Sequence, residues 1–205
     1  MSTMQPLHSP PQSGSETCGA LRLALLGAEQ AQRLYLHAAH RLAADALQVI
    51  AHAFRFTAAQ EGEHAAVLRG LLCACGGSIP AAADDAPLPR EPLSLLRTVR
   101  RMEQERSGAL LPACARAALA EGQPRVARAC QRMAETEARH ARRFAQYAAA
   151  LEEGTLFRAE ERVSWFCLGC GQLHTGFEPP ETCAACGGQR GHFIRTDFYP
   201  FSVEG

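Results

Sequence analysis

The sequence predicts an all-α four-helix bundle followed by a small metal-binding domain, and three observations lead to this fold class. From residue 18 to residue 153 the chain is dominated by Ala, Leu, Arg, Glu and Gln, which are strong helix formers. Breaks in this pattern divide the stretch into four segments. After Gly154 the composition changes to Gly, Cys, Pro and aromatic residues, with two Cys-x-x-Cys pairs.

The breaks place the four helices. Asp45 with Gln48 three residues later resembles a capping box, residues 75–92 hold two glycines and four prolines, and Gly122 with Pro124 forms a stop followed by a start. Short connections join the first pair and the last pair, and a longer crossover joins the second helix to the third. We expect the helices near residues 19–44, 46–74, 92–121 and 124–152.

Composition also suggests the domain boundaries. The first residues are rich in Pro, Ser, Gly and Gln and cannot bury enough apolar surface to order themselves. We therefore expect a disordered tail over residues 1–17, a bundle over 18–153, a linker over 154–163, and a second domain with a C-terminal tail over 164–205.

The overall charge excludes several function classes. The 205 residues carry 21 basic and 21 acidic side chains, so no net charge favours nucleic acid or an anionic membrane. The sequence has neither an apolar run long enough to span a membrane nor a signal-peptide pattern at its start, and we expect a cytoplasmic protein.

Nine cysteines, four of them in close pairs, suit metal ligation better than a disulfide framework. The other five are read as buried apolar residues or spare thiols.

Two helices carry the same pair of potential metal ligands. Glu61 and His64 lie three residues apart, and Glu137 and His140 repeat that spacing. Residues at i and i+3 share a helix face, so each pair can present a carboxylate and an imidazole to one point. One such pair is weak evidence, because a solvated helix face explains it, whereas two copies on alternate helices match the ligand pattern of di-iron carboxylate bundles.

Those bundles need a glutamate from each of the two remaining helices. The third helix offers Glu103, and the first helix offers Glu29 as its only acidic residue before Asp45. Oxygen-rich sites with histidine favour iron and leave room for peroxide or dioxygen.

The four patterned cysteines form a separate and stronger signal. Two knuckles, each a Cys-x-x-Cys-Gly sequence and separated by 12 residues, are the arrangement that closes on one tetrahedral ion. A glycine after each pair permits positive φ and lets backbone N–H groups approach the sulfurs. Iron and zinc both accept this geometry. The predicted ligands are Cys167, Cys170, Cys183 and Cys186.

Four stretches resemble the rubrerythrin family, which fuses a ferritin-like bundle to a C-terminal rubredoxin-like domain. They are GAEQAQRLY at 27–35, TAAQEGEHA at 57–65, AETEARHARRF at 134–144 and WFCLGCGQLHTGFEPPETCAACGGQRGHF at 165–193. The resemblance implies a mononuclear iron in the cysteine knuckle, with zinc as the rival, and a di-iron centre in the bundle. It also places Tyr35 where it could hydrogen-bond a ligand carboxylate, although a core tyrosine explains that residue equally well. The implied di-iron ligands are Glu61, His64, Glu103, Glu137 and His140.

Two positions depart from the family pattern. Ala28 occupies the place of the family's first-helix glutamate, and Glu29 comes one residue later, which is about 100° of helix rotation. Arg106 stands where rubrerythrins usually have a second glutamate on the third helix. We therefore expect no exchange of an iron between that glutamate and a histidine. The arginine could instead pair with Glu103 or Glu29 and keep the site free of metal.

The resemblance implies a non-haem di-iron peroxidase that acts in oxidative stress and reduces hydrogen peroxide at the bundle ligands. Electrons would reach the bundle through the tetrathiolate iron, supplied from NAD(P)H by a redox partner protein. Family members are homodimers or larger homo-oligomers. Two alternatives stay open: a ferritin-like protein that oxidises or holds iron with dioxygen, and a degenerate bundle joined to a structural zinc ribbon.

Overall fold

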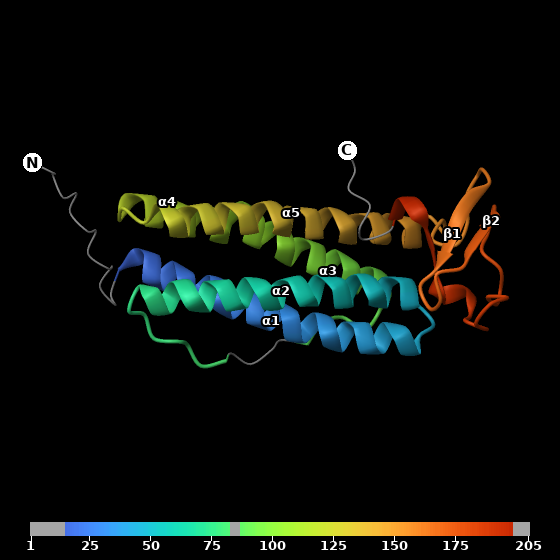
Figure 1. Cartoon of the computed structure of the whole chain (residues 1–205), viewed down its shortest axis with the longest axis horizontal. Helices are drawn as coiled ribbons and strands as arrows, with labels where there is room; N and C mark the ends of the chain where they lie inside the picture. The colour runs from blue at the N-terminus through green and yellow to red at the C-terminus, as the bar shows by residue number, and fades with distance from the viewer. Residues whose placement is uncertain (1–14, 83–86, 199–205) are drawn as a thin grey trace, which may run out of the picture.

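The computed structural model of the chain describes residues 15–82 and 87–198. Long helices lie side by side in a ferritin-like bundle, and a small three-stranded sheet sits at one end of it (Figure 1). The predicted fold class is therefore confirmed. The helical elements are α1 (Glu16–Ala44), α2 (Gln48–Ala74), α3 (Pro92–Glu105), η1 (Arg106–Leu110), α4 (Leu111–Ala120) and α5 (Pro124–Glu152).

The start of α1 lies earlier than the sequence indicated. Ser15 caps the helix, and its side chain accepts a hydrogen bond from the backbone N–H of Cys18. Residues 15–17 thus belong to the bundle rather than to a tail, and the rest of the expected tail lies outside the described residues. Ser is among the residues that best satisfy the free N–H groups of a first turn.

The expected capping box between the first two helices was wrong. Asp45 ends α1, and α2 begins at Gln48 after Leu47, which makes no side-chain cap. Ala46 takes a left-handed conformation with φ of 58° in this tight turn. The Gln48 side chain donates a hydrogen bond back to the Ala43 carbonyl rather than to the start of α2.

The third long helix is continuous from Pro92 to Ala120 but changes to π geometry over η1. The backbone N–H of Leu111 donates to the carbonyl of Arg106, five residues earlier. Pro112 gives a physical reason for the change to π geometry. It has no N–H to donate to the carbonyl of Gly108, four residues earlier, and its ring crowds that carbonyl. Single π turns inside α-helices frequently mark functional sites, and this one begins at Arg106.

The small domain is built on β1 (Val163–Cys167), β2 (Leu173–Gly176) and β3 (Phe193–Arg195), paired antiparallel in the order β2-β1-β3. It shares a hydrophobic core with the bundle, because Ile194 belongs to the same buried cluster as Ile50 and Phe54. Gly191 packs so closely on the turn between α1 and α2 that a Cβ there would lie 1.9 Å from the Ala46 carbonyl oxygen. Tight packing therefore holds the domain against one end of the bundle.

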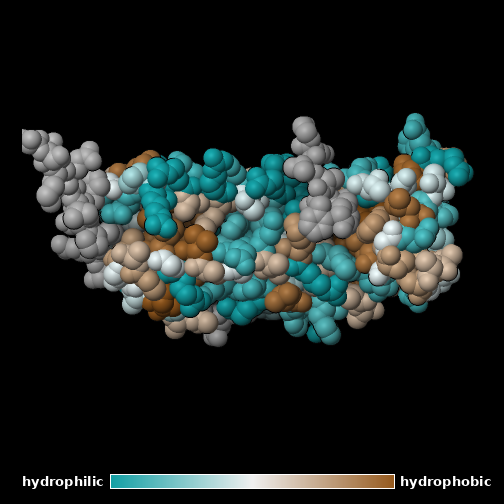
Figure 2. All heavy atoms as spheres, viewed as in Figure 1, coloured by the Kyte–Doolittle hydropathy of each residue, from teal (hydrophilic) through white to brown (hydrophobic). Residues whose placement is uncertain are grey.

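One face of the molecule is mainly polar (Figure 2). Figure 2 shows one face of the molecule, on which hydrophilic residues predominate and hydrophobic residues form scattered patches. Across residues 15–82 and 87–198, none of the helices combines the length and the apolar character that a membrane span requires.

Candidate metal centres

Three glutamates and a histidine converge in the interior of the bundle. Glu61 comes from α2, Glu103 from α3, and Glu137 with His140 from α5. Their ligand atoms lie within 4.8 Å of one another and all four residues are buried. His64 lies beside them, with its Nδ1 3.0 Å from Glu137 Oε1. The structure thus brings together both Glu-x-x-His pairs and Glu103, and these five residues are called the bundle group below.

The guanidinium of Arg106 lies among the carboxylates of the bundle group. Its Nη2 is 2.6 Å from Glu103 Oε2, 3.1 Å from Glu61 Oε1 and 3.1 Å from Glu137 Oε2. Arg106 therefore occupies the position of a cation that three carboxylates would otherwise share. The sequence suggested a pairing with Glu103 or Glu29, and the structure extends it to Glu61 and Glu137 but not to Glu29.

Small residues of α1 make room for the arginine. Gly27 lies against the Arg106 side chain, its carbonyl oxygen is 3.5 Å from Arg106 Nη1, and the next residue, Ala28, is buried. Glu29 does not reach the bundle group. It follows Ala28, so its side chain points about 100° further round the helix, and there it forms an ion pair with Arg69. An apolar residue at 28 and a cation at 106 both keep the negative charge of the interior low.

Protonation reduces this charge further in the metal-free state. Burial raises the pKa of Glu103 to about 7, against the opposing effect of Arg106. Burial lowers the pKa of His140, but hydrogen bonds to Glu103, Glu137 and Glu61 outweigh it and raise that pKa to about 10. The metal-free interior is therefore close to charge balance at neutral pH, which explains how three buried carboxylates coexist there.

Two side chains outside the bundle group orient it. The Tyr35 hydroxyl donates a hydrogen bond of 2.5 Å to Glu103 Oε1. The Nε2 atom of His140 lies 2.9 Å from Gln60 Oε1, so its Nδ1 faces the carboxylates. Sequence reasoning singled out Tyr35 but missed Gln60, because a glutamine next to a ligand glutamate has no recognisable spacing of its own.

The substitution Tyr35→Phe tests this contact. We expect metal-free Y35F to lose about 1–3 kcal/mol of unfolding free energy, because a buried carboxylate loses its donor. Urea denaturation measures the loss. Tyr147→Phe is the matched control, since the Tyr147 hydroxyl donates to the neutral carbonyl of Phe198 over a longer 3.3 Å. A smaller loss in Y35F than in Y147F would contradict the assignment.

The bundle group suits a metal in the types of its donors. Oxygen and imidazole ligands are those that iron takes in carboxylate bundles. Glu61 Oε2 is buried without a hydrogen-bond partner among the described residues, and His64 Nδ1 lies 3.9 Å from it. This oxygen has a lone pair available for a metal, and the opposing feature is Arg106, which competes for the same carboxylates.

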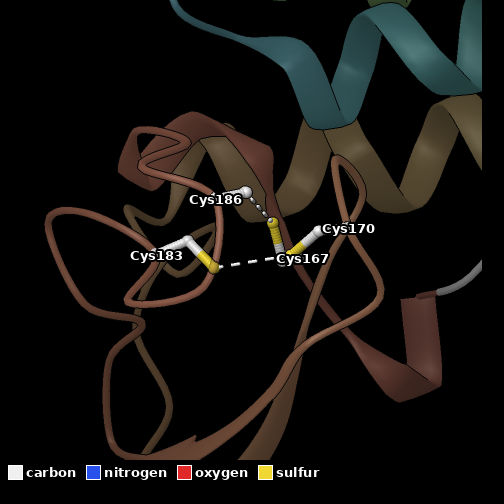
Figure 3. A group of neighbouring side chains, drawn as sticks. All are labelled: Cys167, Cys170, Cys183 and Cys186. Atoms are coloured by element: carbon white, nitrogen blue, oxygen red, sulfur yellow. Dashed lines mark hydrogen bonds between the residues drawn. The ribbon is translucent and has the colours of Figure 1, made fainter.

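The four patterned cysteines meet in the small domain. Figure 3 shows their sulfurs pointing toward one another from two loops. The Sγ–Sγ distances are 3.8 Å between Cys167 and Cys186 and 3.6 Å between Cys170 and Cys183. Sulfurs bound at about 2.3 Å to one tetrahedral ion lie about 3.8 Å apart, so the cysteine cluster fits such an ion.

The backbone around the cysteines stabilises thiolate charge. Gly171 and Gly187 have φ of 81° and 72°, and each donates its N–H to the carbonyl of the first cysteine of its pair. Backbone N–H groups of Ala185 and Cys186 lower the pKa of the Cys183 thiol to about 7. Burial raises the pKa of Cys167, so the loops favour the thiolate, the form that binds metal, at Cys183 in particular.

Aromatic residues cover one side of the cysteine cluster. Trp165 and Phe193 are buried and pack with Cys167 and Cys183. Phe177 is 52% exposed. Cys170 and Cys186 are also exposed, so this side of the cysteine cluster lies at the surface of the small domain.

The chain matches known sequences along most of its length. The family model described as Rubrerythrin matches residues 20–148, and that of the rubrerythrin rubredoxin-like domain matches residues 165–194. A rubrerythrin of Porphyromonas gingivalis is 32% identical over 184 residues, covering 88% of this chain and 90% of that protein. A rubrerythrin of Nitratidesulfovibrio vulgaris is 32% identical over 181 residues, covering 88% and 94%.

Solved structures show the same fold at lower identity. A mixed-valence nigerythrin has a TM-score of 0.61 at 21% identity and covers 93% of this chain and 94% of its own. An open-pore ferritin from Archaeoglobus fulgidus has a TM-score of 0.60 at 17% identity and covers 69% and 87%. Both kinds of site that the matched family carries, a glutamate–histidine group for a di-iron centre and a four-cysteine rubredoxin-like site, are present in this chain.

Proposed function

Because the chain belongs to the rubrerythrin family, we propose that it is an oxidoreductase that reduces hydrogen peroxide to water at the bundle group. One observation carries the proposal: buried carboxylates and a histidine from three helices converge within 4.8 Å in a chain that also holds a tetrathiolate cluster. Burying several carboxylates is costly even beside Arg106, and the chain nevertheless keeps three of them together with a histidine.

The bundle group would supply the ligands, namely Glu61, His64, Glu103, Glu137 and His140. A di-iron centre held by these residues would supply the electrons that reduce peroxide. Tyr35 holds Glu103 in place, and Gln60 fixes the ring of His140 so that Nδ1 faces inward. The surrounding core excludes water from the reacting atoms.

Arg106 must leave the carboxylates before metal can bind. Its side chain is anchored in a π turn that contains Gly108, and its Nη1 already lies beside the Gly27 carbonyl. A rotation of the side chain toward α1 would free the three carboxylates. Metal loading is therefore a competition between a built-in cation and iron.

The cysteine cluster, loaded with iron, would relay electrons from a redox partner protein that takes them from NAD(P)H. The exposed Cys170 and Cys186 offer the contact. Glu61 lies about 20 Å along α2 from the end that contacts the small domain, at 1.5 Å per residue. This separation is long for direct transfer within one chain, and a homo-oligomer that placed a second subunit's cysteine cluster nearer the bundle group would shorten it.

A second function is favoured by one observation, the position of Arg106. An arginine paired with all three carboxylates leaves the bundle stable without metal. The chain would then be a structural or binding protein with zinc in the cysteine cluster. Storage or oxidation of iron by dioxygen uses the same bundle group as peroxide reduction and differs from it in the preferred oxidant.

Stopped-flow mixing of the reduced, iron-loaded protein with hydrogen peroxide or dioxygen tests the proposal. We expect peroxide to oxidise the bundle iron at least tenfold faster than dioxygen does, followed by the appearance of the visible colour of ferric tetrathiolate iron as the cysteine cluster gives up its electron. Faster reaction with dioxygen would favour iron handling. No oxidation of iron in the bundle would favour the structural function.

A further inference from the structure

Four of the five cysteines outside the small domain are buried together at the opposite end of the bundle. Cys18 lies in the first turn of α1, Cys75 ends α2, Cys114 lies in α4, and Cys130 lies near the start of α5. All four are buried in one hydrophobic cluster. Figure 1 shows these helix ends together, away from the sheet. The sequence, in which the four are widely separated, indicated only scattered thiols.

Two of these thiols are in direct contact. The Sγ atoms of Cys114 and Cys130 are 3.1 Å apart and share a hydrogen bond. The Cys18 thiol instead donates to the backbone carbonyl of Cys75 at 3.5 Å. Of the two cysteine contacts, only the one between α4 and α5 therefore brings two sulfur atoms together, as disulfide formation requires.

The geometry does not suit a metal ion. Among the described residues, groups of three or more ligand atoms within 4.8 Å occur only at the bundle group and the cysteine cluster. The 3.1 Å separation is also shorter than the 3.6 and 3.8 Å separations in the cysteine cluster. A disulfide needs about 2.05 Å, so a sulfur approach of roughly 1 Å would complete one.

We propose that Cys114 and Cys130 form a redox-active dithiol that a peroxide converts into a disulfide joining α4 to α5. One thiolate attacks peroxide, so that an S–O bond forms, the O–O bond breaks, and the leaving hydroxide takes a proton to become water. The second sulfur then attacks the sulfenic acid, the S–S bond forms, and a second water leaves. Two thiols lose two electrons in total and one peroxide gains them.

Peroxide reaches the pair through local opening of the helix ends. Both cysteines lie within about two turns of the short connection between α4 and α5, where helices open at lower free energy than in the middle of a bundle. Oxidation should accordingly be slow and should accelerate in mild denaturant. The step needs no metal in the bundle group, so it is separable from the proposed peroxidase activity.

Peptide mapping of the full-length, zinc-loaded chain tests the proposal, because zinc keeps the cysteine cluster ligated and is redox-inert. The reduced protein is treated with hydrogen peroxide, alkylated in denaturant and cut with trypsin. We expect the peptides of residues 107–116 and 129–132 to appear as one disulfide-linked species. Its mass should be two hydrogens below the summed masses of the two peptides, and dithiothreitol should separate them. The disulfide should raise the melting temperature by roughly 5 °C, because it closes a loop in the unfolded chain.

The variants C114A and C130A should lose both the linked peptide and the melting shift. The variant C73A is the matched control, since Cys73 is exposed on α2, and it should keep both. Recovery of Cys114 and Cys130 as alkylated thiols after excess peroxide would overturn the proposal. A cross-link between Cys18 and Cys75 instead, or oxidation of Cys114 to sulfinic acid without a link, would overturn it as well.

Discussion

Replacing Arg106 with alanine should change iron binding and metal-free stability in opposite directions. The metal-free R106A variant leaves three buried carboxylates without their cation, and we expect it to lose about 3–5 kcal/mol of unfolding free energy. Its affinity for ferrous iron in the bundle should rise at least tenfold, because the competing charge has gone. Urea denaturation and equilibrium titration with ferrous iron measure the two effects.

The matched control is R101A, which removes an exposed arginine from the same helix. It should change neither quantity. The variant R106E should bind iron still more tightly than R106A, because it adds a carboxylate in place of the guanidinium. If R106A lost stability and iron affinity together, Arg106 would be a structural support of the bundle rather than a competitor for its metal.

Removing one ligand of the cysteine cluster should disconnect the bundle from its electron supply. We expect C170S to lower steady-state peroxide reduction by at least tenfold, with the bundle iron content unchanged. Cys170 is exposed, so its substitution disturbs packing less than that of the buried Cys183. Turnover is followed with a reductase and NAD(P)H.

The control for this experiment is C73A, which also removes an exposed thiol and should keep full turnover. In a single turnover, chemically reduced C170S should still consume peroxide at the parent rate. Equal steady-state turnover of C170S and the parent would show that the cysteine cluster lies outside the electron path.

Much of the fold and part of the site were predictable from local patterns. The helical composition and the breaks at residues 75–92 and 122–124 placed the helices, because Gly and Pro act through local backbone geometry. The i, i+3 pairs placed Glu61 with His64 and Glu137 with His140 on inward faces, because helix periodicity determines which residues share a face.

The remaining features depend on contacts between helices. The spacing of Arg106 after Glu103 suggests an inward direction, but only the packing of α2 and α5 shows that one guanidinium reaches Glu61 and Glu137 as well. The contact between Cys114 and Cys130 likewise requires the register of α4 against α5. The exact start of α2 depended on the tight turn at Ala46, which no capping residue signals.

The iron content of the bundle tests the central claim most directly. The full-length protein is made metal-free, titrated with ferrous iron without oxygen, and freed of loosely bound metal before iron and zinc per chain are counted. The account predicts about three irons per chain, two in the bundle group and one in the cysteine cluster, with R106A reaching this number at lower iron concentration. One metal ion per chain in both proteins, all of it in the cysteine cluster, would contradict it.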